Sequence, residues 1–331
     1  MRNFDRYPPV QDSAVEIVIF LDKHNSCIFF SFPEALFIYN HNPLAFSIKG
    51  IILKKIKRVL VYGSSSFLKK NETKSIIKYL SRKCSLVDIF SLGEDLNKPH
   101  SKKYDLILSI GGDGIFLSAS KFAYSNSTPI VGLNFGRIGF LADLDKKNLQ
   151  LKIKDILDGN YIIDKRTLLS GSIMSGDKKY NSIALNDIVI NNRGTLKMID
   201  MNIYVNENLI TKQRSDGVIV ATPTGSTAYA MSNGCPIVSP NSNVTCIVPI
   251  APHSYGQRSV IINNTDDILI EINKKSKLNS QVTFDGANNL TIESPDKIVI
   301  KRAKRQLMIV HPCDYDYFNA LAKKLKYEIK S

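Results

Sequence analysis

The chain has 331 residues, of which 44% are hydrophobic and 22% charged, and its formal net charge is +14. The composition excludes a disordered chain, and the length exceeds what one small core needs, so we expect two domains. The positive charge suits an anionic small substrate. The basic residues are mostly lysine, without a basic stripe of interleaved aromatic residues, so we expect no nucleic-acid partner.

Residues 1–55 are interpreted as an N-terminal extension of unknown role. They are apolar but interrupted by charged residues and proline, and they contain no clean 18-residue apolar span. We therefore expect no membrane partner. A start site assigned too far upstream explains the segment equally well.

Residues 56–160 are predicted to form an α/β domain. Short apolar runs alternate with segments of helical spacing, which is typical of a mostly parallel sheet with helices on both faces. Asn71 is expected to cap the first of these helices. The predicted strands lie in "IKRVLVYG", "SLVDIFSLG", "YDLILSIGG" and "TPIVGLNFG", and the predicted helices in "NETKSIIKYLSRK", "IFLSASKFAY" and "NLQLKIKDILDGNY".

The pattern changes after about residue 161. Short alternating runs separated by turn residues predict a β-rich, sandwich-like domain over residues 161–305. The tail "YDYFNALAKKLKYEI" returns to helical spacing, and we expect the C-terminal segment, residues 306–331, to pack back on the first domain. The chain has five cysteines without CxxC spacing, which predicts neither a disulfide framework nor a zinc site and suits a cytoplasmic location.

The most informative turn is Gly111-Gly112-Asp113-Gly114, between a buried strand and the start of a helix. Glycines let backbone N–H groups approach an anion, and a helix N-terminus favours phosphate. A bare carboxylate would repel phosphate there, unless a divalent cation intervenes or the carboxylate takes a proton from an attacking hydroxyl. Taken alone, the turn fits a helix-capping aspartate equally well.

Further motifs separate these two interpretations. "SIGGDGIFL", "VGLNFGRIGFLAD", "LNDIVI", "RSDGVIVATPTGSTAYAMSNGCPIVSP" and "VPIAPHS" follow one another along the chain. In this order the chain resembles the NAD kinase family over about residues 56–327. GGDG also occurs in phosphofructokinases and in lipid kinases, but the long "DGVIVATPTGSTAYAMSNG" block is specific.

The resemblance implies a kinase that uses ATP, or alternatively polyphosphate, to phosphorylate the 2′-hydroxyl of the adenosine ribose of NAD, giving NADP. It also implies a phosphofructokinase-like α/β domain followed by a β-sandwich-like domain, with the active site between them. We expect Mg²⁺ or Mn²⁺ to arrive bound mainly through the nucleotide phosphates. A homodimer or homotetramer is expected.

The resemblance also implies roles for individual residues. Asp113 corresponds to the general base, Gly114 leaves room for the ribose, and Gly111 and Gly112 lie against the donor phosphates. Asn186 and Asp187 correspond to the pair that binds the ribose hydroxyls, although an ordinary strand-end turn is the alternative.

Other expected NAD contacts are less specific. Lys197 corresponds to a basic position facing the dinucleotide, where a solvated lysine is nearly as plausible. Arg214 and Asp216 resemble residues around the nicotinamide half, with Arg214 reaching the ligand of a neighbouring subunit; a plain Arg–Asp ion pair is the alternative. The remaining expected NAD-binding residues are Thr227, Ala228, Tyr229, Ala230, Met231 and Ser232.

Two other functions remain open from the sequence. One is a different GGDG kinase, such as a lipid kinase, and the other is a nucleotide sensor without turnover. One departure from the family pattern is Ala287, where the family often carries glutamine, so we expect no side-chain contact there.

Overall fold

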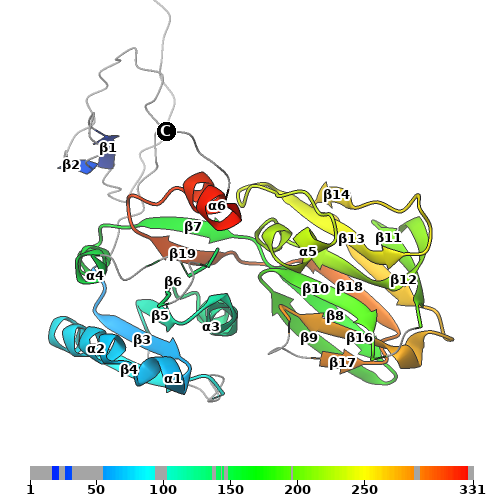
Figure 1. Ribbon diagram of the computed structural model, residues 1–331, viewed down its shortest axis with the longest axis horizontal. Helices are drawn as coiled ribbons and strands as arrows, with labels where there is room; N and C mark the ends of the chain where they lie inside the picture. The colour runs from blue at the N-terminus through cyan, green and yellow to red at the C-terminus, as the bar shows by residue number, and fades with distance from the viewer. Residues whose placement is uncertain are drawn as a thin grey trace, which may run out of the picture.

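The structure is a computed structural model that describes residues 17–21, 27–31, 55–93, 103–135, 139–142, 144, 148–194, 197–286 and 291–326. Two sheets dominate it, one in each half of the molecule (Figure 1). In the N-terminal extension, β1 (Ile17–Leu21) and β2 (Cys27–Ser31) pair antiparallel. Among the described residues, no helix has the length and apolar character needed to cross a membrane.

The first sheet has six described strands in the order β4-β3-β5-β6-β19-β7. All neighbours are parallel except β7, which is antiparallel to β19. β5 is buried along its whole length, as expected for a central parallel strand covered on both faces. The bounds are β3 (Arg58–Gly63), β4 (Leu86–Ser91), β5 (Leu106–Ile110), β6 (Ile130–Leu133), β7 (Ile162–Arg166) and β19 (Leu307–His311).

Helices cover both faces of this sheet, which confirms the predicted α/β architecture. One core cluster joins the sheet to α2 and α4, and a second joins the opposite face to α3. Asn71 is the first residue of α2 and Lys70 occupies the cap without a side-chain hydrogen bond, so the predicted cap is wrong by one position. The helices are α1 (Ser65–Leu68), α2 (Asn71–Lys83), α3 (Asp113–Asn126) and α4 (Leu149–Asp158).

The second sheet has eleven described strands, and its main path runs β17-β16-β10-β12-β11-β15-β18-β8-β9, with β13 and β14 branching from β12. All of its neighbouring strands pair antiparallel. The bounds are β8 (Leu169–Ser175), β9 (Lys178–Ala184), β10 (Asp187–Asn192), β11 (Ile199–Val205), β12 (Asn208–Ala221), β13 (Val244–Pro252), β14 (Val260–Asn263), β15 (Ile268–Ile272), β16 (Ser280–Phe284), β17 (Thr291–Glu293) and β18 (Lys297–Arg302).

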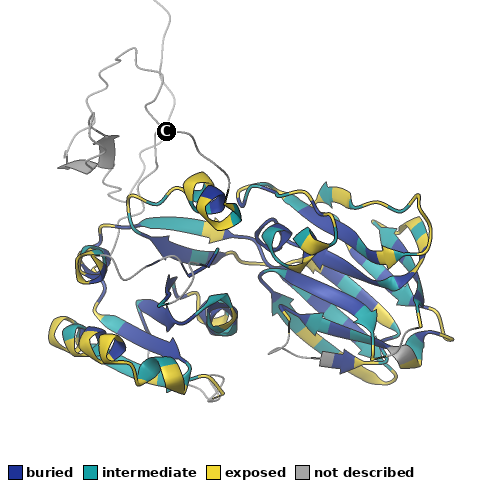
Figure 2. Ribbon diagram, in the orientation of Figure 1, coloured by how far each residue is buried: buried dark blue, intermediate teal, exposed yellow. Residues whose placement is uncertain are grey.

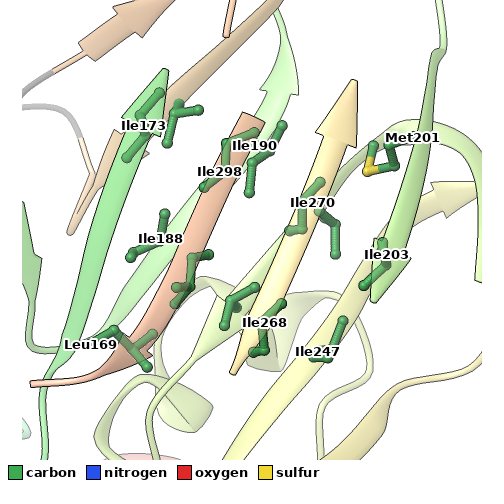
Figure 3. Close-up of a cluster of buried hydrophobic side chains, with 14 of the residues drawn as sticks. Leu169, Ile173, Ile188, Ile190, Met201, Ile203, Ile247, Ile268, Ile270 and Ile298 are labelled. Atoms are coloured by element: carbon green, nitrogen blue, oxygen red, sulfur yellow. The ribbon is translucent and has the colours of Figure 1, made fainter. Parts of the chain in front are cut away.

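One aliphatic core fills this β-rich half. Alternate residues of strands that lie far apart in the sheet order, such as Ile173, Ile190 and Ile270, belong to the same buried cluster (Figure 3). The sheet therefore closes on itself in a sandwich-like way, as the alternating sequence predicts. Figure 2 shows the same buried stripes along these strands.

The end of the chain returns to the first domain. β19 lies between β6 and β7 in the first sheet, and α6 (Tyr317–Leu325) follows it (Figure 1). The side chain of Asp316 caps α6 by accepting hydrogen bonds from two of its first backbone amides. β7 begins directly after residue 161, so the first sheet uses strands on both sides of the β-rich half.

Candidate functional site

The GGDG turn stands where β5 ends and α3 begins. Gly111 has φ +152°, and Gly112 occupies the N-cap of α3, so Asp113 is the first helical residue. The first backbone amides of a helix have no acceptor within the helix. Because Gly114 is exposed, the turn is open to a ligand on that side. A helix N-terminus behind a parallel strand suits a phosphate chain.

The carboxylate of Asp113 contacts the segment 139–142. Its Oδ2 accepts a hydrogen bond from the backbone N–H of Phe140 at 3.0 Å. Its Oδ1 accepts from the N–H groups of Leu141 and Ala142 at 3.1 and 3.2 Å. The aspartate therefore does not cap its own helix, which was the alternative left open by the sequence.

A second carboxylate organises the start of β10. Asp285 follows β16 in a left-handed conformation, with φ +53°. Its oxygens accept hydrogen bonds from the backbone N–H groups of Leu185, Asn186 and Asp187 at 3.0, 2.7 and 3.3 Å. The conformation of the Asn186–Asp187 pair is thus fixed by a residue about a hundred positions further along the chain.

Burial sets the charge state of this pair of carboxylates. It raises the pKa of Asp187 to about 7, with the nearby charge of Asp285 adding to the effect. Burial also raises the pKa of Asp285, against the three amide donors and the charge of Lys121, which lower it. Asp187 therefore holds a proton at mildly acidic pH, when it can donate as well as accept a hydrogen bond.

The Asp187→Asn variant tests this charge state. The folded protein keeps a proton on Asp187 that the unfolded chain releases at about pH 4, so the contribution of Asp187 to stability falls as the pH rises from about 4 to 7. We expect the free energy of unfolding of the variant, relative to wild type, to increase over that range. Urea unfolding at pH 5, 6.5 and 8 measures it, with the exposed Asp177→Asn as control. A constant difference between variant and wild type would show that Asp187 is charged throughout.

The segment after β12 packs directly against Asn186. A 3-10 turn, η1 (Thr224–Thr227), is followed by one helical turn, α5 (Tyr229–Ser232). A Cβ at Gly225 would lie 2.0 Å from the carbonyl oxygen of Asn186, so only glycine permits this approach. The backbone N–H of Thr222 donates to the same carbonyl oxygen at 2.9 Å.

The two halves of the site meet at the domain junction. Leu185 belongs to the same buried cluster as Phe116 and Leu117 of α3, the helix that begins with Asp113. The charge of Lys121, also on α3, acts on Asp285. The structure therefore brings the helix of the GGDG turn up to the Asn186–Asp187 strand end.

A buried ion pair of the first domain also holds η1, because its arginine donates a hydrogen bond to Thr224. Arg166 Nη2 lies 2.6 Å from Asp164 Oδ2 on β7, and Arg166 Nη1 donates to Thr224 Oγ1 at 3.2 Å. His311 Nε2, on the neighbouring strand β19, lies 3.6 Å from the same Asp164 oxygen. Arg166 is only 2% exposed, so this contact is part of the interior.

Arg214 and Asp216 lie on the outward face of β12, away from the Asn186 end. Ala221, the register partner of Asp187, is seven residues beyond Arg214, or about 24 Å along an extended strand. Arg214 Nε lies 3.9 Å from Asp200 Oδ1, an exposed ion pair with a partner other than Asp216. Within one chain, the structure does not bring Arg214 to the other expected residues.

The remaining expected contacts differ in their exposure. Tyr229 is 46% exposed, and Lys197 and Ser232 are also exposed. Thr227, Ala228 and Met231 are half-buried. Ala230 is buried in the core cluster behind β12 and β13, so its side chain faces the interior. Ala287 lies outside the described residues.

Sequence reasoning missed Asp285, Arg166 and Gly139 as residues that shape the site. The first two act on partners distant in the sequence, and Gly139 is distinguished only by its contact with Asp113. The "TFDG" stretch that contains Asp285 was the one signal available, since an acidic residue before glycine at a strand end often fixes a turn.

Comparison with known proteins gives consistent matches. Residues 48–161 match the ATP-NAD kinase N-terminal domain, and residues 185–312 match the ATP-NAD kinase C-terminal domain. An NAD kinase of Coxiella burnetii (strain RSA 493 / Nine Mile phase I) is 39% identical over 228 residues, which is 69% of this chain and 76% of the relative. An NAD kinase of Legionella pneumophila (strain Paris) is 37% identical over 229 residues, 69% of this chain and 78% of the relative.

Solved structures agree on the fold. The crystal structure of an NAD kinase from Archaeoglobus fulgidus in complex with ATP superposes with a TM-score of 0.67 at 27% identity, over 81% of this chain and 98% of that one. The crystal structure of yeast NADH kinase complexed with NADH gives a TM-score of 0.71 at 20% identity, over 84% and 90%. With both domains matched and relatives this similar over most of their length, the chain belongs to the NAD kinase family.

Proposed function

We propose that this chain transfers the terminal phosphoryl group of ATP to the 2′-hydroxyl of the adenosine ribose of NAD. The observation that carries the proposal is the junction itself: a glycine turn with a carboxylate at a helix N-terminus, joined by buried contacts to the Asn186–Asp187 strand end. The turn suits the donor phosphates, and an amide beside a carboxyl group suits a vicinal diol.

In this proposal Asp113 is the general base. The ribose hydroxyl donates a hydrogen bond to the carboxylate and attacks the γ-phosphorus. The new O–P bond forms, the bond from phosphorus to the bridging oxygen of ADP breaks, and the hydroxyl proton passes to Asp113. The aspartate mainly orients the nucleophile and accepts the proton late in the transfer. Asn186 and Asp187 hold the ribose, and Tyr229 and its neighbours receive the dinucleotide.

In this proposal a divalent cation arrives at the site bound to the phosphates of the nucleotide. Among the residues that the structure describes, no group of three or more His, Cys, Asp or Glu side chains gathers to hold a metal ion. Mg²⁺ or Mn²⁺ would therefore take most of its ligands from phosphate oxygens and water. Bound there, it would neutralise charge that develops on the phosphates.

We also propose that the protein acts in the cytoplasm. We propose further that its complete site forms only in an oligomer. Arg214 lies about 24 Å along β12 from the strand end at Asn186, and it is exposed and available to a second copy. The outlying strand β14 presents Val260 and Ile261 at 43% and 48% exposure, which is suitable apolar surface for such an interface. Light scattering that gives a monomer in the active enzyme would contradict the proposed oligomer.

The decisive experiment is an assay of the purified chain with NAD, ATP and Mg²⁺, coupled to an NADP-specific dehydrogenase. We expect NADP formation that depends on all three components. Diacylglycerol replaces NAD in a parallel reaction, because a lipid kinase is the principal alternative for a GGDG turn. NAD binding without turnover would instead indicate a sensor.

A further inference from the structure

The segment Gly139–Ala142 fits closely around the Asp113 carboxylate. Three consecutive backbone amides donate to its oxygens, at 3.0 to 3.2 Å. A Cβ at Gly139 would lie 1.9 Å from Oδ1 and 2.6 Å from the carboxyl carbon. No side chain larger than hydrogen fits at position 139 unless the carboxylate or the segment moves.

The segment is itself held on both sides. After it, Leu144 donates its N–H to Gly132 O at 3.0 Å and accepts from Asn134 N–H at 2.9 Å, which fastens it to the end of β6. On the other side, Lys324 Nζ of α6 lies 5.4 Å from the centre of the Phe140 ring. The amides that face Asp113 are thus fixed by a strand of the first sheet and touched by the C-terminal helix.

The role of this contact follows from how many hydrogen bonds the Asp113 carboxylate oxygens can still accept. Each carboxylate oxygen offers two lone pairs. Among the described residues, Oδ1 accepts two amide hydrogen bonds and Oδ2 accepts one. The segment therefore occupies three of the four positions and leaves one on Oδ2, with the rotation of the carboxylate fixed.

We propose that the backbone of Gly139–Ala142 is a positioning element that aims the free acceptor position of Asp113 Oδ2 at the acceptor hydroxyl. The inference rests on the proposed function. Gly139 acts through Asp113 and is a positioning residue. The contact of Lys324 with Phe140 makes the C-terminal helix part of the same support.

The Gly139→Ala variant tests the positioning role. An added methyl group must displace the carboxylate or the amides that hold it, and a misplacement of about 1 Å can cost about a hundredfold in rate. We expect kcat to fall about 10- to 100-fold, while KM for NAD stays close to the wild-type value. The matched control is Gly256→Ala, where the new methyl group would make only an ordinary contact, 3.9 Å from Ser254 Oγ, and its kcat should be unchanged.

A second pair of measurements separates positioning from mere structural damage. In an Asp113→Ala background the clash disappears, so Gly139→Ala should add little further loss of kcat and should lower the melting temperature less than it does alone. Amide hydrogen exchange at Phe140, Leu141 and Ala142 should also be faster in Asp113→Ala than in wild type, whether or not Gly139→Ala folds.

Three outcomes would overturn the inference: normal kcat in Gly139→Ala, equal kcat losses from Gly139→Ala in both backgrounds, or unchanged exchange of the three amides. Failure of the proposed function would be a different result: the wild-type chain itself would form no NADP.

Discussion

The Asp113→Asn variant should lose about 10²- to 10⁴-fold in kcat, the usual contribution of a positioned general base. An asparagine is nearly the same size and keeps one oxygen for the backbone amides of segment 139–142, but it cannot accept the hydroxyl proton. NAD binding relies mainly on other groups, and asparagine can still accept a hydrogen bond from the ribose hydroxyl, so the dissociation constant of NAD should change little. Steady-state kinetics and calorimetric titration with NAD measure the two quantities.

The control for this prediction is Asp177→Asn, the same substitution on an exposed turn. Unfolding curves of both variants show whether the loss of rate comes from lost structure. A kcat of Asp113→Asn within about threefold of wild type would reject the general-base role, and the carboxylate would then serve only to hold the segment beside it.

The largest loss of stability is expected from Arg166→Met. The side chains of the Arg166–Asp164 pair are 3% and 16% exposed, so methionine would fill the space but leave Asp164 without its guanidinium partner. Removing one partner of a buried ion pair typically costs about 3–5 kcal/mol. Urea unfolding should show a decrease of that order. A decrease below about 1 kcal/mol would mean that the pair behaves like a surface ion pair.

The matched control is Arg193→Met, which breaks an ion pair of similar length, 2.9 Å, between side chains 49% and 52% exposed. Its free energy of unfolding should fall by less than about 1 kcal/mol.

The pH dependence of stability gives an independent check on the Arg166–Asp164 pair. Burial raises the pKa of Asp164, but hydrogen bonds and charges from His311 and Arg166 outweigh it and lower the pKa to about 2. Its stabilisation is present above about pH 4 and is lost as the pH falls through 2, and Arg166→Met should weaken that acid dependence.

The fold could be predicted from the sequence where local patterns are strong. β5 is apolar except for Ser109 and is followed by two glycines, which indicates a buried parallel strand before a phosphate turn. The membership of β7 and β19 in the first sheet could not be predicted in the same way. Their sequences also suit the β-rich half, and only the pairing of residues more than a hundred positions apart assigns them.

The same limit applies to the site. Asp113, Asn186 and Asp187 stand in recognisable motifs, and their roles as base and ribose contacts stay predictions. Asp285 and Arg166 could not be found by pattern, because an acceptor for three amides or a donor to Thr224 has no local signature. The one-residue error at Asn71 has a smaller cause: helix ends depend on competing turn geometries that differ little in energy.

The placement of β19 has a consequence for synthesis of the protein. Leu307–His311 lies between β6 and β7, and among the described residues β7 pairs with no other strand. During synthesis the whole β-rich half therefore leaves the ribosome before β19 does. The first sheet stays incomplete until β19 has been made. Until then the part of the β6 edge that Leu144 does not cover is open to pairing with other chains, and a chain cut before residue 307 would keep this part permanently exposed.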